Sequence, residues 1–207
     1  MTAVVLNLEQ VNLTDEQFYR LCHANQNWNL ERTARGDLVI MPRRAKWLRS
    51  SSPTTGDAIA SRSGESGQRE ADLITDLNLW NRQAKLGVVF SSSTIFSLPN
   101  GGDRSPDAAW IKSDRWNALT DKQQKGFPPL CPDFVIELRS QSDALKPLQE
   151  KMQEYLDSGL QLGWLIDPQN NRAEIYHPQQ DVQVVELPTQ LSGKDVLPGF
   201  SLKLAKF

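Results

Sequence analysis

Apolar residues recur at helical spacing in two long segments, residues 69–85 and 145–158. The inward-facing positions of the first are Leu73, Leu77, Trp80 and Ala84, and those of the second are Leu145, Leu148, Met152, Tyr155 and Leu156. A residue every third or fourth position forms one apolar face of a helix, so both segments are predicted to be amphipathic helices that pack inward. Gly159 is placed to end the second helix. A shorter helix is predicted after Thr14, because Thr14 and Gln17 match the capping-box pattern.

Short apolar runs bounded by turn residues predict the strands. A hairpin is expected first, with Leu30–Thr33 and Leu38–Met41 flanking a turn that contains Gly36. The later strands are expected at residues 87–90, 94–98, 107–111, 133–138, 162–168, 173–177 and 182–187. Between two of them, residues 113–130 predict a helical insertion in which Thr120 is the N-cap. The pattern indicates an α/β (α+β) fold with one mixed sheet.

Residues 51–67 are rich in Ser, Thr, Gly and Pro and have little apolar content. Such a composition predicts a flexible or ligand-ordered loop that contributes nothing to a core. The 207 residues are enough for one domain. We therefore expect a single domain over residues 1–207, with an N-terminal helix and hairpin in 1–50, the loop in 51–67 and the core in 68–207.

Composition narrows the range of function classes. The 23 Lys and Arg residues nearly balance the 25 Asp and Glu residues, so no overall basic field indicates a protein that coats nucleic acid. Cys22 and Cys131 are far apart, and with only two histidines the chain has no zinc-ligand pattern. No apolar run approaches the roughly 20 residues that span a bilayer. The N-terminus lacks a basic, then apolar, leader. A cytoplasmic protein with no membrane association is expected.

Three carboxylates flank apolar runs in the middle of the chain: Asp107 in Ser-Pro-Asp-Ala-Ala-Trp, and Asp133 and Glu137 in Pro-Asp-Phe-Val-Ile-Glu-Leu-Arg. Acids beside β-forming residues are costly to bury unless a cation lies between them. A divalent metal suits such oxygen ligands, and a hard-cation site indicates phosphoryl chemistry. Asp133 is four residues before Glu137, about 13 Å away in an extended strand. It is a poor partner for Glu137 at one metal ion, and we expect it to cap a turn.

Glu70 lies on the core-facing side of the predicted 69–85 helix, whereas Asp72 and Asp76 lie on the outer side. Two interpretations remain open for Glu70. One is a first-turn carboxylate that the helix dipole favours. The other is a member of the site, which binds a metal ion through water or tunes it.

The order of these elements resembles the PD-(D/E)XK, or restriction-endonuclease-like, superfamily. In that superfamily a helix bearing an acid precedes a strand opened by Pro-Asp, a strand with an inward Glu, a helix and a buried strand, giving an αβββαβ core. More closely, residues 132–140 followed by Lys151, Tyr155, Gly159 and the Trp-Leu-Ile-Asp-Pro run of 164–168 resemble a bacterial family of putative restriction endonucleases that is abundant in cyanobacteria. The resemblance covers roughly residues 10–205.

The resemblance implies a site and a cofactor. Asp107 is at the position of the first metal-binding aspartate and Glu137 at that of the acid of the (D/E)XK element, and both would bind Mg²⁺ or Mn²⁺. The superfamily lysine, two positions after the acid, is replaced by Arg139. Arg139 stays protonated and cannot act as a base, but it can hold a phosphate or stabilise developing charge. Lys151 is the expected substitute for the lysine, the alternative being a lysine whose stem lies along a solvated helix edge.

DNA is the partner that the resemblance implies. The local cluster Arg43, Arg44, Lys46 and Trp47 is the best candidate for contacts to the phosphate backbone and to a base, although a basic solvated loop is in general the more common explanation of such a cluster. A homodimer would suit cleavage of both strands. Two alternatives to an endonuclease remain: a nuclease fold that binds nucleic acid or a protein without cutting, and a metal hydrolase acting on small phosphates.

Overall fold

The computed structural model describes residues 4–8, 10–42 and 64–205. Its helices are α1 (Asp15–Ala24), α2 (Gly64–Ala84), α3 (Ser113–Asn117), α4 (Asp121–Lys125), α5 (Leu145–Asp157) and the 3₁₀ turn η1 (Pro168–Asn170). Its first seven strands are β1 (Val4–Leu6), β2 (Trp28–Arg32), β3 (Leu38–Pro42), β4 (Gly87–Ser91), β5 (Phe96–Ser97), β6 (Asp103–Arg104) and β7 (Ala108–Lys112). The remaining strands are β8 (Phe134–Leu138), β9 (Leu162–Asp167), β10 (Arg172–Tyr176), β11 (Gln183–Glu186), β12 (Thr189–Ser192) and β13 (Ser201–Leu204).

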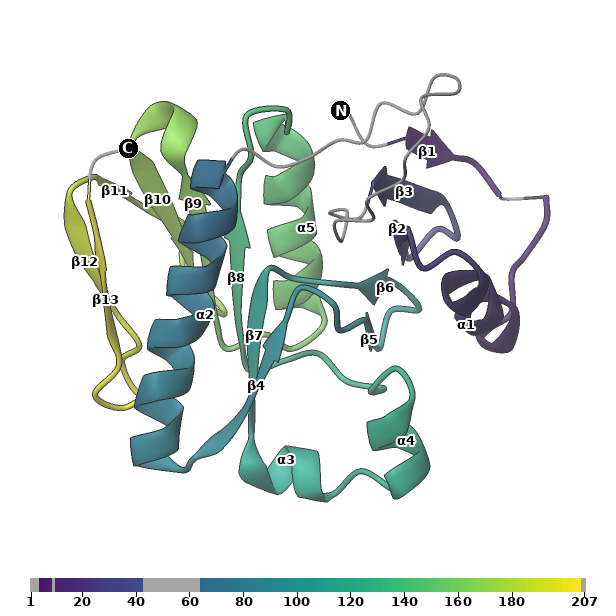
Figure 1. Cartoon of the computed structure of the whole chain (residues 1–207), viewed down its shortest axis with the longest axis horizontal. Helices are drawn as coiled ribbons and strands as arrows, with labels where there is room; N and C mark the ends of the chain where they lie inside the picture. Colours follow the sequence, from purple (N-terminus) through teal and green to yellow (C-terminus); the bar gives the residue numbers. More distant parts are fainter. Residues whose placement is uncertain (1–3, 9, 43–63, 206–207) are drawn as a thin grey trace, which may run out of the picture.

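A six-stranded mixed sheet, in the order β11-β10-β9-β8-β7-β4, is the centre of the molecule (Figure 1). β8 and β9 are parallel, with α5 as the crossover between them, and the other neighbouring pairs are antiparallel. The elements α2, β4, β7, β8, α5 and β9 therefore follow in the predicted αβββαβ order. The mixed sheet and the restriction-endonuclease-like fold class are confirmed.

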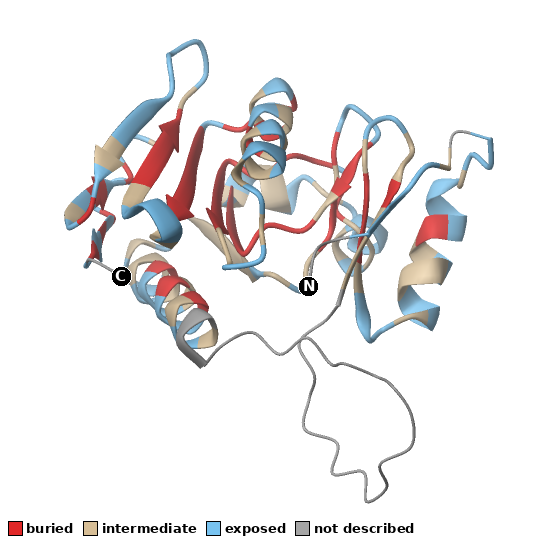
Figure 2. Cartoon of the chain, turned by 90° about the horizontal axis from the view of Figure 1, so that it is seen from above, coloured by how far each residue is buried: buried red, intermediate tan, exposed pale blue. Residues whose placement is uncertain are grey.

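The two long helices cover opposite faces of this sheet, and Figure 2 shows the strands between them. Alternation along β8 separates the faces, because successive side chains of a strand point to opposite sides. Phe134, Ile136 and Leu138 pack in the cluster that contains Leu73 and Leu77 of α2. Val135 packs in the cluster that contains Met152 and Tyr155 of α5. Glu137 has the same parity as Val135, so its side chain lies on the α5 face.

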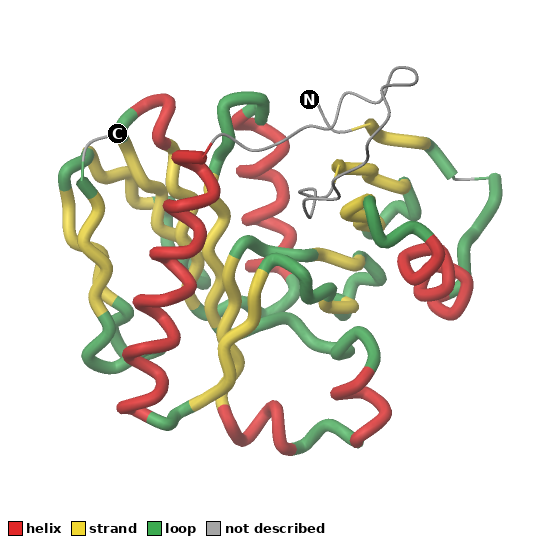
Figure 3. The backbone as a smooth tube through the Cα atoms, viewed as in Figure 1, coloured by secondary structure: helices red, strands yellow, loops and turns green. Residues whose placement is uncertain are grey.

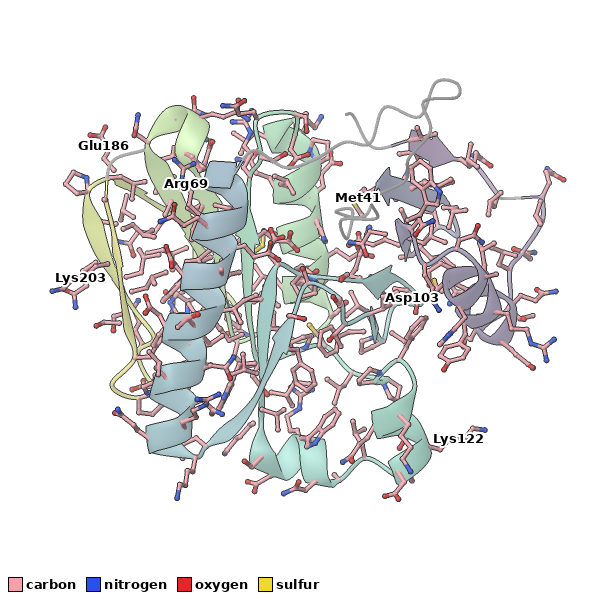
Figure 4. All side chains as sticks on the ribbon, viewed as in Figure 1. Met41, Arg69, Asp103, Lys122, Glu186 and Lys203 are labelled. Atoms are coloured by element: carbon pink, nitrogen blue, oxygen red, sulfur yellow. The ribbon has the colours of Figure 1, made fainter. Side chains whose placement is uncertain are left out.

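A second, five-stranded sheet joins the N-terminal hairpin to the core in the order β1-β3-β2-β6-β5. β6 belongs to the segment between β4 and β7, so this sheet brings residues of the N-terminal segment beside the start of β7. The junction is fastened by Arg32, whose Nε donates to Asp103 Oδ2 at 2.7 Å and whose Nη2 donates to Asp15 Oδ1 at 2.6 Å. Figure 4 shows Asp103 facing the N-terminal elements.

Most predicted elements are present, and the tube in Figure 3 shows how loops separate them. The capping boxes at Thr14 and Thr120 both form. Three predictions differ from the structure. α2 begins at Gly64, inside the predicted loop; the strand expected at 94–98 shortens to β5; and the single expected sheet is accompanied by two others, one of them the C-terminal pair β12-β13. In the described ranges no helix is long and apolar enough to cross a lipid bilayer.

Candidate functional site

Asp107 and Glu137 meet where β7 begins and β8 ends. β7 and β8 are antiparallel, and the register pairs Ala108 with Ile136. One step further along the same register, Asp107 lies opposite Glu137. Asp107 Oδ2 accepts a hydrogen bond of 2.8 Å from the backbone N–H of Leu138, and both carboxylates are buried. The β7-β8 register thus places the two acids opposite each other across neighbouring strands, as predicted.

Two side chains of α5 reach Glu137 from the helix that covers this face. Lys151 Nζ lies 2.9 Å from Glu137 Oε1, and the Tyr155 hydroxyl donates to the same oxygen at 3.1 Å. Lys151 and Tyr155 are four residues apart and therefore lie on one face of the helix. Lys151 is not a lysine on a solvated helix edge, because only 11% of its side chain is exposed. The structure thus brings Asp107, Glu137 and Lys151 into one cluster.

A third acid, Glu31 of β2, enters the cluster from the N-terminal sheet. Its Oε1 lies 2.8 Å from Lys151 Nζ and accepts from the backbone N–H of Ser105 at 3.0 Å. Its Oε2 pairs with Arg104 Nη1 at 3.1 Å. Sequence reasoning missed Glu31. The available signal was a charged Glu-Arg pair inside a predicted strand, directly after the apolar Leu30.

The charges of the cluster shift one another's proton affinities. Burial raises the pKa of the Glu137 carboxyl to about 7; Asp107 and Glu31 push it upward and Lys151 opposes them. Burial would also raise the pKa of Glu31, but Lys151 and Arg104 outweigh it and hold that pKa below its ordinary value. For Lys151, burial would lower the pKa, yet Glu137 and Glu31 raise it above its ordinary value. Lys151 is therefore a charged ammonium at neutral pH, and Glu137 is the acid that titrates there.

Glu70 is buried at the N-terminal part of α2, on the other side of the sheet from α5. Its Oε1 accepts from the Ser92 hydroxyl at 2.5 Å. Ser92 in turn accepts, through its carbonyl, from the Ser105 hydroxyl at 2.7 Å, and the Ser105 carbonyl accepts from Lys151 at 3.2 Å. Glu70 is thus connected to Lys151 through two serines. Burial and this connection favour the interpretation of Glu70 as part of the site.

The Arg139 side chain contacts Asp167 and Asp143. Its Nη1 pairs with both carboxylate oxygens of Asp167, at 3.0 and 3.1 Å, and its Nε donates to the Asp143 carbonyl at 3.0 Å. β8 and β9 are parallel and in register, with Leu138 beside Ile166, so Arg139 and Asp167 follow side by side. Asp167 is completely buried and requires a cationic partner. The contacts of Arg139 are therefore with Asp167 and Asp143, and its expected role beside Asp107 and Glu137 stays a prediction.

Asp133 lies at the opposite end of β8 from Glu137. Its carboxylate accepts from the backbone N–H of Lys112 and from Arg115, both at 2.8 Å, where the chain turns from β7 into α3. It holds a turn, as predicted. The proposed DNA-contacting residues Arg43, Arg44, Lys46 and Trp47 lie outside the described residues.

The donor set suits a hard cation. Asp107 and Glu137 offer only oxygen, and Mg²⁺ is commonly held by one or two carboxylates while it keeps several waters. The described residues contain no group of three or more His, Cys, Asp or Glu side chains arranged to hold a metal ion. The raised pKa of Glu137 beside Asp107 marks a place where a positive ion would stabilise both carboxylates. The residues present therefore fit Mg²⁺ or Mn²⁺ bound through two acids.

The αβββαβ core, with an acid beside β7, an acid on β8 and a lysine on the following helix, is the arrangement of the restriction-endonuclease-like fold class. A family model described as "Uma2: Putative restriction endonuclease" matches residues 54–205. The chain belongs to this Uma2 family. The first 53 residues, which include Glu31, lie outside the match.

A solved structure of similar fold is a putative nuclease belonging to DUF820 from Anabaena variabilis ATCC 29413. It is 19% identical to this chain, with a TM-score of 0.60, and the similarity covers 69% of this chain and 79% of that one. At this identity the likeness concerns the fold alone. No curated protein matches the chain.

Proposed function

We propose that the protein is a divalent-metal-dependent endonuclease that hydrolyses phosphodiester bonds in DNA. Asp107 and Glu137 would hold Mg²⁺ or Mn²⁺. The observation that carries the proposal is the convergence of Asp107, Glu137 and Lys151 at one end of β7 and β8. When bound, the metal would supply Lewis-acid activation of the attacking water and of the phosphoryl oxygen.

Lys151 contributes positive charge. Glu137 and Glu31 raise its pKa above the ordinary value, which favours the charged ammonium at neutral pH. A fixed ammonium offsets, through its charge, the negative charge that develops in phosphoryl transfer. Glu70 would act from the other side of the sheet through Ser92 and Ser105.

The substrate side of the proposal rests on the resemblance. The segment with Arg43, Arg44, Lys46 and Trp47 would follow the DNA backbone and stack on a base. Two copies of the chain would cut the two strands of a duplex.

The direct test is nicking of supercoiled plasmid by the purified protein in Mg²⁺, in Mn²⁺ and in EDTA, with single-stranded DNA and RNA as further substrates. Glu137→Gln is the inactive variant and Glu186→Gln, at an exposed position of β11, is the control. Metal-dependent nicking that Glu137→Gln abolishes and Glu186→Gln retains supports the proposal. Cleavage that persists undiminished in Glu137→Gln contradicts it.

One observation favours a second candidate, a module that binds nucleic acid without cutting it: position 139 holds an arginine that is paired with Asp167. If that candidate is right, the protein shifts the electrophoretic mobility of DNA in EDTA and shows no cleavage in either metal.

A further inference from the structure

We infer that Glu31, which lies outside the family match, is a positioning residue of the nuclease site that holds the Lys151 ammonium in place. The inference rests on the proposed function, in which Lys151 supplies the positive charge. Glu31 lies on β2 of the N-terminal sheet, and Lys151 lies on α5. Their charged atoms lie 2.8 Å apart.

The ammonium has a complete set of acceptors. A lysine ammonium has three N–H donors. Lys151 Nζ lies 2.8 Å from Glu31 Oε1, 2.9 Å from Glu137 Oε1 and 3.2 Å from the Ser105 carbonyl. A flexible four-carbon side chain is thus held at three points. Of the two carboxylates, Glu137 is also the proposed metal ligand, so Glu31 is the acid that would stay paired with the lysine when a metal ion is bound.

Glu31 is itself rigidly held. Its Oε1 accepts from the Ser105 N–H at 3.0 Å, and its Oε2 pairs with Arg104 Nη1 at 3.1 Å. Arg104 Nε also donates to Glu154 Oε2 at 2.7 Å, which links it back to α5 one turn after Lys151. Glu31 is 2% exposed, so water does not compete for these contacts. Buried supporting hydrogen bonds of this kind keep a catalytic group within the narrow limits that catalysis needs.

This arrangement assigns a function to the N-terminal segment. The five-stranded sheet continues from β2 into β6, directly before Ser105 and Asp107, so its register sets where Glu31 meets the core. In this protein the 54–205 family region does not by itself contain all the groups that fix its lysine. The N-terminal sheet completes the site.

The test compares Glu31→Gln with Glu174→Gln in the full chain. Glu174 is a matched control, because it is also 2% exposed and is held by Gln149, Arg172 and Tyr176, which are not residues of the site. For Glu31→Gln we expect kcat of plasmid nicking to fall between roughly tenfold and hundredfold with KM little changed, since a misplaced catalytic group loses rate at about that scale. Glu31→Asp, which keeps the charge but shortens the side chain, should fall between wild type and Glu31→Gln. Glu174→Gln should keep its kcat at the same folded fraction.

Metal affinity separates positioning from ligation. Titration calorimetry with Mn²⁺ should give wild-type affinity for Glu31→Gln and weakened affinity for Glu137→Gln. An equal loss of affinity in both variants would make Glu31 a metal ligand and overturn the inference, as would unchanged kcat in Glu31→Gln.

A readout without catalysis keeps the two proposals distinguishable. The rate at which an amine-reactive reagent labels Lys151, followed by mass spectrometry, reports directly on how the ammonium is held. We expect faster labelling in Glu31→Gln than in wild type and Glu174→Gln. If wild type cuts no substrate while this difference is observed, the proposed function fails and the positioning of Lys151 stands. Equal labelling in all three proteins overturns the positioning.

Discussion

Asp107 accepts a hydrogen bond from the backbone N–H of Leu138, the residue directly after Glu137, at 2.8 Å. This contact attaches the first acid to the backbone of the strand that carries the second. The separation of the two carboxylates is therefore governed by the β7-β8 register rather than by a loop. Under the proposed function, an oxygen pair fixed in this way would be preorganised for a metal ion.

Asp107→Asn should abolish metal-dependent cleavage while it preserves the fold. The asparagine oxygen can still accept from Leu138, but the negative charge is lost. Mutation of a residue that only hydrogen-bonds to a metal ligand already costs roughly 10- to 100-fold in metal affinity or activity. The loss of the ligand itself should therefore cost at least about 100-fold. Plasmid nicking and Mn²⁺ titration measure it.

Asp133→Asn is the matched control for that variant. Asp133 also follows a proline, is equally buried, and accepts from a backbone N–H at 2.8 Å. Its activity should remain close to wild type. A comparable loss of cleavage in both variants would show that general disruption, rather than metal ligation, explains the effect.

Lys151→Met should destabilise the metal-free protein strongly. It leaves Glu31 and Glu137 buried without their shared cation, and breaking a buried ion pair costs about 3–5 kcal/mol. Urea unfolding in EDTA measures the free energy of unfolding. Adding Glu137→Gln to Lys151→Met should recover part of the loss, because one unpaired acid is removed.

Lys146→Met on the same helix provides the comparison. Its side chain is 86% exposed and its partner Glu150 is 3.9 Å away, so the change should cost little. If Lys151→Met were no more destabilising than Lys146→Met, the buried pairing of Lys151 would be wrong.

The stability of the metal-free protein should fall as pH rises through neutrality. The Glu137 carboxyl has a pKa of about 7 in the folded protein, against 4.5 ordinarily. Because the folded state binds this proton more tightly, its contribution is complete below about pH 4.5 and is lost as pH rises through 7. A shift of that size corresponds to about 3 kcal/mol.

The measurement is the difference in unfolding free energy between wild type and Glu137→Gln, in EDTA from pH 4 to pH 8. The contributions of groups that titrate equally in both proteins cancel in this difference. Added Mg²⁺ should stabilise wild type more at pH 8 than at pH 5, because the metal needs the deprotonated acid. A pH-independent difference would contradict the raised pKa.

Arg139→Met should cost stability rather than catalysis. Asp167 is fully buried, and Arg139 binds both of its carboxylate oxygens. Its removal should lower the free energy of unfolding by about 3–5 kcal/mol, with kcat within a few-fold of wild type at an equal folded fraction. Arg139→Lys keeps the charge but loses the Nε donor that contacts the Asp143 carbonyl, and it should be intermediate in stability. A large fall in kcat at unchanged stability would return Arg139 to the site.

Local patterns were sufficient for much of the fold. The apolar spacing of residues 145–158 corresponds to α5, and the capping boxes at Thr14 and Thr120 form as their residue types predict. These features depend on neighbours three or four positions away, which the sequence displays directly. The start of α2 was misplaced because its first residues have a loop-like composition, and a helix that packs against a sheet can extend beyond its own propensity.

By itself the sequence determined the long helices, most strands of the central sheet and the acids Asp107 and Glu137 beside them, because hydrophobic periodicity and capping are properties of short segments. Only the tertiary structure decided which charges meet. Lys151 pairs with Glu31, 120 positions away, and Arg139 pairs with Asp167, 28 positions away. A buried charge takes the partner that the sheet registers bring within reach, and those registers depend on how distant strands pack together.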